Sequence, residues 1–76
     1  MDVKEAWENN LIKINRKFKC KYQNIEYDVK LVTTEGEWLF NEVGENLEIF
    51  LLDVDCGVIL CDIDDAYIFE IIKKEG

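Results

Sequence analysis

Histidine, serine and proline do not occur in this chain, and arginine occurs only at Arg16. Without histidine or serine, the chain cannot form a Ser–His or Cys–His nucleophile pair, and it lacks the usual general base near pH 7. A zinc site that uses histidine is excluded, and three cysteines are too few for a site of four thiolates. We therefore expect a protein that is not an enzyme and that holds no cofactor and no metal.

Long apolar runs and glycine-rich phosphate-binding motifs are absent as well. The longest unbroken apolar stretches span four residues, as at 49–52, whereas a membrane helix needs about 20. Acidic residues near the start replace the positive charges of a secretory signal. An odd number of cysteines favours reduced thiols, with a Cys56–Cys61 disulfide as the weaker alternative. These features predict a cytoplasmic protein with no membrane contact.

The size of the chain allows one hydrophobic core. With 76 residues, of which 49% are apolar, folding would bury about 60% of the surface of the extended chain. We therefore expect a single domain over residues 1–76. The richness in Lys, Asn and Ile is typical of AT-rich coding, which fits a low-GC bacterium, or a phage or mobile element living in one.

The beginning of the chain has the pattern of a helix. Asp2 is a candidate N-cap, and Glu5 follows three residues later, as in a capping box. We expect the helix to end near Asn9 or Asn10. Four apolar residues follow helical spacing and would form the buried stripe: Val3, Ala6, Trp7 and Leu11.

Two segments, 17–22 and 25–31, alternate strictly between polar and apolar residues, which predicts a β-hairpin. The residues between them are Gln23 and Asn24, and asparagine tolerates the positive φ of a tight turn. A two-residue turn sets apolar residues opposite apolar ones on one face. On the other face it sets Lys19 opposite Asp28, and Lys21 opposite Glu26, so one register satisfies both faces.

Further strands are predicted at 47–53, 58–63 and 67–72, and a turn at 34–36 would set Leu31 opposite Phe40. Strands that are apolar on both faces need cover on both. We therefore predict a mainly β (α+β) fold: an N-terminal helix followed by a five- to six-stranded antiparallel small barrel, SH3-like or Sm-like. The alternative is an open antiparallel sheet with one helix packed on a face.

Charge is distributed unevenly. Residues 1–30 carry seven basic and five acidic side chains, a balance of +2, and residues 31–76 carry two and twelve, a balance of −10, which together give −8. The basic run at 13–21 resembles a nucleic-acid strip, but Lys19 and Lys21 face carboxylates in the predicted hairpin, and the acidic chain would repel phosphates. Direct nucleic-acid binding is therefore not expected.

The acidic half displays carboxylates at turns and strand ends. If the 53–55 and 62–65 turns meet, their five aspartates share one rim. Such a rim would attract a basic, nucleic-acid-binding partner by mimicking phosphates, as a phage or mobile-element inhibitor would. Solubility alone is the simpler reading. A self-assembling barrel that binds a small ligand or nucleotide between subunits is the alternative function. The candidate partner-binding residues are Glu45, Glu48, Asp53, Asp55, Asp62, Asp64 and Asp65.

Overall fold

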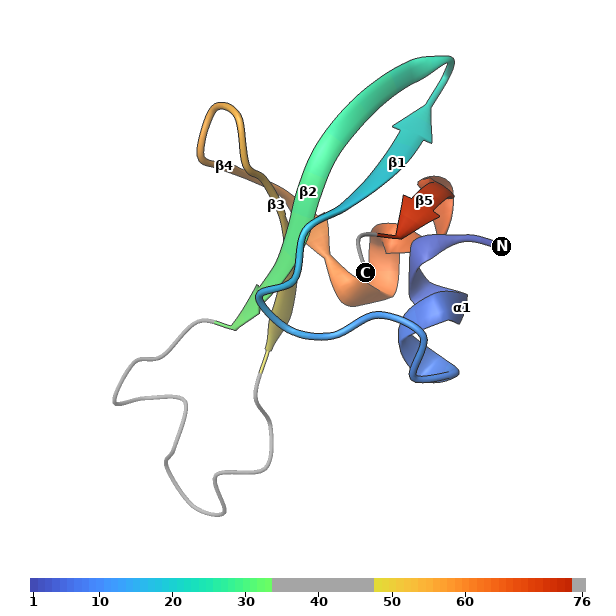
Figure 1. Cartoon of the computed structure of the whole chain (residues 1–76). Helices are drawn as coiled ribbons and strands as arrows, with labels where there is room; N and C mark the ends of the chain where they lie inside the picture. Colours follow the sequence, from blue (N-terminus) through green and yellow to red (C-terminus); the bar gives the residue numbers. More distant parts are fainter. Residues whose placement is uncertain (34–47, 75–76) are drawn as a thin grey trace.

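The computed structural model describes residues 1–33 and 48–74 (Figure 1). Its elements are, in chain order, a short helix, two strands, two further strands, a 3₁₀ helix and a last strand. Their bounds are α1 Val3–Glu8, β1 Phe18–Tyr22, β2 Ile25–Thr33, β3 Ile49–Asp53, β4 Val58–Asp62, η2 Ile63–Ile68 and β5 Glu70–Lys74. This composition confirms the predicted mainly β fold with an N-terminal helix.

The five strands form one antiparallel sheet in the order β4-β3-β2-β1-β5 (Figure 1). Closing a barrel requires a ladder between the two outer strands. Among the described strands, β4 and β5 lie at opposite edges of the sheet and do not pair with each other. The 3₁₀ helix η2 connects these two edge strands. The sheet is therefore open, so the closed SH3-like or Sm-like barrel was wrong and the open-sheet alternative fits.

The N-terminal residues lie along the outer edge of β5. The Val3 N–H donates to the Phe69 carbonyl, and the Ile71 N–H donates to the Met1 carbonyl, both at 2.9 Å. An isolated bridge joins Asp2 to Glu70 on the side of β5 that faces away from β1. This edge of the sheet therefore has backbone partners from the start of the chain.

Helix α1 begins and ends where the sequence predicts. An Asp2 carboxylate oxygen accepts from the Glu5 N–H at 2.8 Å, and Asn9 is the C-cap. The predicted apolar stripe was wrong in its last member: Leu11 is exposed, and Ile12 is buried instead. The helix has already ended there, since Asn10 has a φ of 61°, so the helical spacing no longer decides which side chain faces the core.

The β1–β2 hairpin has the predicted register at all five positions, from Phe18 opposite Val29 to Tyr22 opposite Ile25. Gln23 and Asn24 both have positive φ, at 52° and 67°, as a type I′ turn requires. The expected cross-strand ion pair forms, with 2.7 Å between the Lys19 Nζ and the Asp28 Oδ1. Local alternation and one turn were sufficient to fix this hairpin.

Two predictions about the later strands were wrong. Leu31 lies opposite Leu51 of β3, not Phe40, while the strand predicted around Phe40 lies outside the described residues. The last strand begins at Glu70 instead of residue 67, because residues 63–68 form η2. β2 pairs with β1 on one side and with β3 on the other. The alternation of polar and apolar residues predicts that a segment is a strand, but it cannot show which distant strand lies on its second side.

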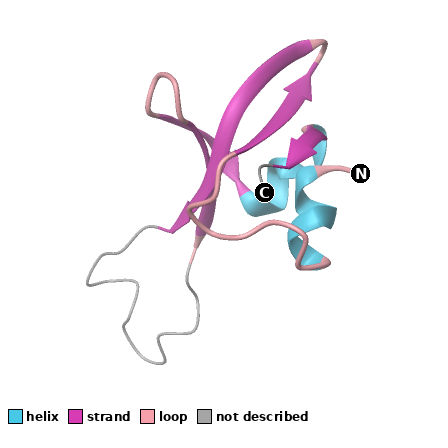
Figure 2. Cartoon of the chain, viewed as in Figure 1, coloured by secondary structure: helices cyan, strands magenta, loops and turns pink. Residues whose placement is uncertain are grey.

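The core lies between the concave face of the sheet and the pair α1 and η2, which pack against each other (Figure 2). Phe69, at the end of η2, joins the two layers. Its ring centroid lies 5.5 Å from that of Tyr22 and 5.8 Å from that of Tyr27. The buried residues are Val3, Ala6, Ile12, Phe18, Cys20, Val29, Leu31, Leu51, Ala66 and Phe69.

Candidate functional site

The predicted acidic residues divide into two groups at opposite ends of the β3–β4 hairpin. At one end Asp53 pairs with Val58, next to the turn that carries Asp55. At the other end Phe50 pairs with Asp62, where the chain enters η2. Three residues of strand separate the ends, which is about 10 Å. The hypothesis that the five aspartates share one rim is therefore wrong. Glu45 lies outside the described residues.

Asp53 supports the turn and is not displayed to solvent. Its side chain is buried, and its Oδ1 accepts from the Asp55 N–H at 2.9 Å and from the Cys56 N–H at 3.4 Å. The Gly57 N–H donates to the Asp53 carbonyl at 2.8 Å, and Gly57 has a φ of 71°. Asp53 thus holds the four-residue turn between β3 and β4, which makes it a structural residue.

Asp55 lies in a neighbourhood of mixed charge. It lines a surface pocket together with Lys17, Lys19 and Asp28, two of which form the 2.7 Å ion pair of the hairpin. The lysines of the predicted basic strip thus lie beside carboxylates here. This end of the β3–β4 hairpin therefore offers a partner little net charge of either sign.

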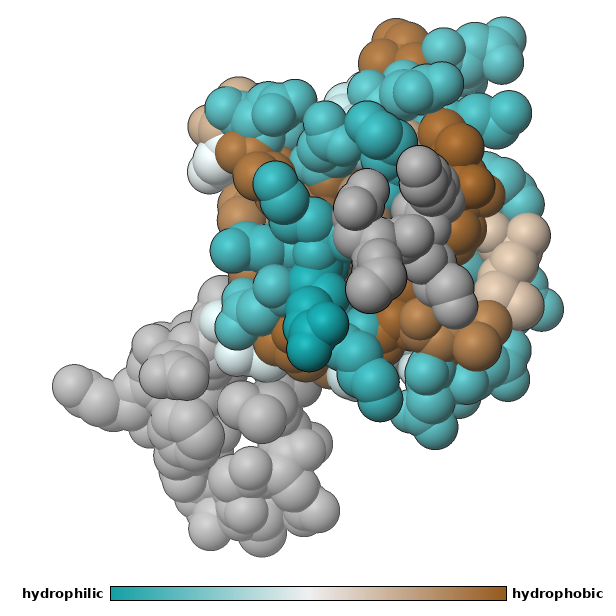
Figure 3. Space-filling model, in the orientation of Figure 1, coloured by the Kyte–Doolittle hydropathy of each residue, from teal (hydrophilic) through white to brown (hydrophobic). Residues whose placement is uncertain are grey.

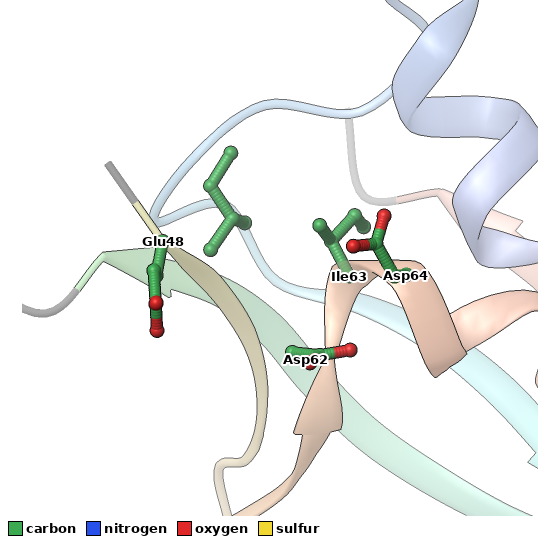
Figure 4. Close-up of a pocket in the computed structure, with 5 residues that line it drawn as sticks. Glu48, Asp62, Ile63 and Asp64 are labelled. Carbon is green, nitrogen blue, oxygen red and sulfur yellow. The ribbon is translucent and has the colours of Figure 1, made fainter. Parts of the chain in front are cut away.

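At the Asp62 end of the hairpin, carboxylates lie close together without a basic residue among the described residues of the pocket lining. Glu48 precedes β3, Asp62 ends β4 and Asp64 lies in η2, and all three line one pocket with Ile49 and Ile63 (Figure 4). Among the described residues that line this pocket, none is basic. We call the surface formed by Glu48, Asp62, Asp64 and the neighbouring Asp65 the acidic end.

The acidic end is held in shape by a helix cap. Asp62 is the N-cap of η2, and its Oδ1 accepts from the Asp65 N–H at 3.0 Å. This bond fixes the direction in which η2 leaves β4, and with it the positions of Asp64 and Asp65, which are both exposed. The sequence analysis missed this cap. The spacing of Asp62 and Asp65 repeats that of Asp2 and Glu5, which was the available signal.

The three cysteines are free thiols with raised pKa values. Burial raises the pKa of Cys20 to about 12 and that of Cys61 to about 11. For the exposed Cys56, a hydrogen bond to Asp53 is the main cause of its raised pKa. Because the thiolate is the nucleophile and the metal ligand, all three are poorly suited to either role at neutral pH.

Within 1–33 and 48–74, no group of three or more His, Cys, Asp or Glu side chains is arranged to hold a metal ion. In those two ranges, no helix is long and apolar enough to cross a membrane.

Apolar side chains also reach the surface. The off-parity residues Ile68 and Ile72 are exposed, while Val32, Phe50 and Leu52 are half-buried, and Leu39 lies outside the described residues. Val58 and Ile59 of β4 are 52% and 44% exposed, and apolar surface interrupts the hydrophilic surface in this region (Figure 3). The sequence predicted a strand there but could not show that it lies at an edge.

Comparisons with protein-family models, with curated proteins and with solved structures find no match to this chain.

Proposed function

We propose that this protein is a non-enzymatic interaction protein that docks a basic, nucleic-acid-binding protein through its acidic end. The observation that supports this role is the pocket of Glu48, Asp62 and Asp64, whose charged lining is entirely acidic among the described residues. Carboxylates spaced along a rigid turn resemble the phosphates of a nucleic acid in charge and in hydrogen-bond acceptance. A phage or mobile-element inhibitor that occupies a nucleic-acid-binding surface is the specific form of this proposal.

The charge distribution supports the same role. The chain carries a net charge of −8, and basic side chains lie beside carboxylates at the opposite end of the β3–β4 hairpin. A basic partner is therefore attracted over long range and oriented toward the acidic end. Such attraction is screened over about 10 Å at 0.1 M salt, so the complex should weaken as salt rises.

The test is a pull-down from nuclease-treated bacterial lysate, washed with a salt series and read by mass spectrometry. We expect a basic protein that is retained at low salt and lost at high salt. The variant Asp62→Asn/Asp64→Asn/Asp65→Asn should weaken its retention by about threefold to 150-fold, taking about 0.2–1 kcal/mol for each of three exposed ion pairs. Asparagine also serves as an N-cap, so η2 should be preserved.

A charge-matched control separates the effect of the acidic end on binding from the effect of the net charge of the whole chain. Glu5→Gln/Glu8→Gln/Glu26→Gln removes the same three charges from exposed positions on α1 and the β1–β2 hairpin, and it should leave retention nearly unchanged. Equal losses in the two variants would mean that only net charge matters. Recovery of the bait with copies of itself alone would overturn the proposal in favour of the self-assembling, ligand-binding alternative.

A further inference from the structure

Among the described strands, none pairs with the outer edge of β4. β4 and β5 are the two ends of the sheet, and the N-terminal residues occupy the outer edge of β5 through backbone hydrogen bonds. In the described part of the chain, β4 pairs only with β3. An edge strand without a neighbour presents a row of backbone N–H and C=O groups that can pair with another strand.

β4 carries only part of the usual protection of an edge strand. Natural edges are blocked by lysine, proline, inward-pointing charges, β-bulges or short length. Residues 58–62 contain no lysine, no proline and one charge, at Asp62, although the strand is short and contains a bulge. Val58 and Ile59 are both exposed. The register shifts opposite Leu51 and Leu52, so that Leu60 is an extra residue. This bulge twists β4. A strand added at the outer edge of β4 can therefore pair with it over only a few residues.

A second copy of this chain is a poor occupant for the edge. Antiparallel pairing of β4 with itself about Leu60 would bring the turn carrying Asp55 against Asp64 and Asp65 of the second copy. Parallel pairing would set Asp62 beside Asp62 of the second copy. Each copy also carries a net charge of −8, and like charges placed directly opposite each other destabilise strand pairing.

We propose that β4 accepts an extended, basic segment of the partner as an additional antiparallel strand, an inference that rests on the proposed docking function. Apolar side chains of that segment would lie beside Val58 and Ile59. Lysine or arginine at its N-terminal end would meet the acidic end, because antiparallel pairing sets the start of the added strand beside Asp62. Backbone hydrogen bonds supply affinity in this mode of recognition, and the charges fix register and direction.

The test uses a synthetic peptide as the probe: acetyl-Lys-Arg-Lys-Val-Thr-Val-Thr-Val-amide, titrated into the isotope-labelled full chain. We expect amide exchange in β4 to slow by tenfold or more when the peptide is bound, with little change in α1. A second peptide with the same side chains carries N-methyl groups at alternate backbone nitrogens, which removes its hydrogen-bond donors on the pairing side. It should bind at least tenfold more weakly.

Two matched variants locate the contact. Ile59→Lys places a cation on the β4 edge and should weaken peptide binding by tenfold or more. Ile25→Lys makes the same change at the tip of the β1–β2 hairpin, where the side chain is also exposed (56%), and should leave the binding constant unchanged. Equal effects of the two variants would overturn the β4 assignment.

The outcomes distinguish the two proposals. If the N-methylated peptide binds as tightly as the unmodified one, and the acidic-end variant weakens both equally, strand addition is wrong and docking at the acidic end stands. If neither peptide binds, strand addition is again wrong, and the pull-down decides the docking proposal by itself. Exchange in β4 that slows with rising protein concentration, without peptide, would show that a second copy covers the edge and would overturn the inference.

Discussion

Replacing Asp53 tests whether this residue supports the β3–β4 turn or contributes to binding a partner. In Asp53→Ala, the Asp55 and Cys56 N–H groups lose a carboxylate acceptor that lies 2.9 and 3.4 Å from them. A hydrogen bond to a charged group contributes about 1.5–3 kcal/mol. Because Asp55 and Cys56 are exposed and water can replace part of the bond, we expect a loss near the lower end, about 1.5 kcal/mol.

Urea unfolding followed by circular dichroism measures this loss. With a slope of about 1 kcal/mol per molar urea for so small a chain, the midpoint should fall by about 1.5 M. Asp53→Asn keeps an acceptor oxygen and should lose less than half as much. Asp55→Ala, at an exposed position two residues away, should change the free energy of unfolding by no more than about 0.5 kcal/mol.

Two results would refute this reasoning. Equal midpoints for Asp53→Ala and Asp55→Ala would show that the two hydrogen bonds contribute nothing measurable. Loss of partner capture by folded Asp53→Ala, with its urea midpoint unchanged, would return Asp53 to the binding surface where the sequence analysis placed it.

Three further predictions concern the backbone, the core and the thiols. Gly57→Ala should destabilise the fold by about 1 kcal/mol through its φ of 71° alone, since a Cβ there meets nothing within 4 Å; Gly57→Asn should cost less in the same urea assay. Leu51→Ala removes a side chain that is fully buried and should cost about 2–5 kcal/mol, enough to leave much of this small chain unfolded at 25 °C by circular dichroism. The pKa values of Cys20 and Cys61, raised to about 12 and 11 from 9.0, keep protons on the folded chain that the unfolded chain has released. The stability that these thiols contribute should therefore be fully present below pH 9 and be lost between pH 9 and 12. The loss should be shallower in Cys20→Val/Cys61→Val, and Cys56→Ala should change it less, because Cys56 is exposed.

The acidic end and the β4 edge adjoin at Asp62, which ends β4, caps η2 and lines the pocket. A partner strand on β4 therefore reaches the carboxylates without any change in the backbone of this chain. The same arrangement explains why open apolar surface near β4 need not lead to aggregation in the absence of a partner, because the nearby negative charges repel a second copy.

The local elements follow from short stretches of sequence. The register of the β1–β2 hairpin followed from residues 17–31, since a shift by one residue would have turned Phe18 and Val29 to the wrong face and separated Lys19 from Asp28. The start of α1 followed from Asp2 in the same way. In these elements every interacting residue lies within about a dozen positions along the chain, so composition and spacing were sufficient.

The strand order and the grouping of the carboxylates depend on contacts between residues far apart in the chain. The pairing of β5 with β1 joins residues 49 to 56 positions apart. The contacts of Met1 and Val3 along the outer edge of β5 join residues 66 to 70 positions apart, and no local pattern encodes such contacts. The strand order places β4 at an edge of the sheet that the described strands form. The direction of the β3–β4 hairpin then separated Asp53 and Asp55 from Asp62, Asp64 and Asp65. In sequence these aspartates are alike. Burial and hydrogen bonding give Asp53 a structural role. At the acidic end, the described residues that line the pocket are only acidic or apolar.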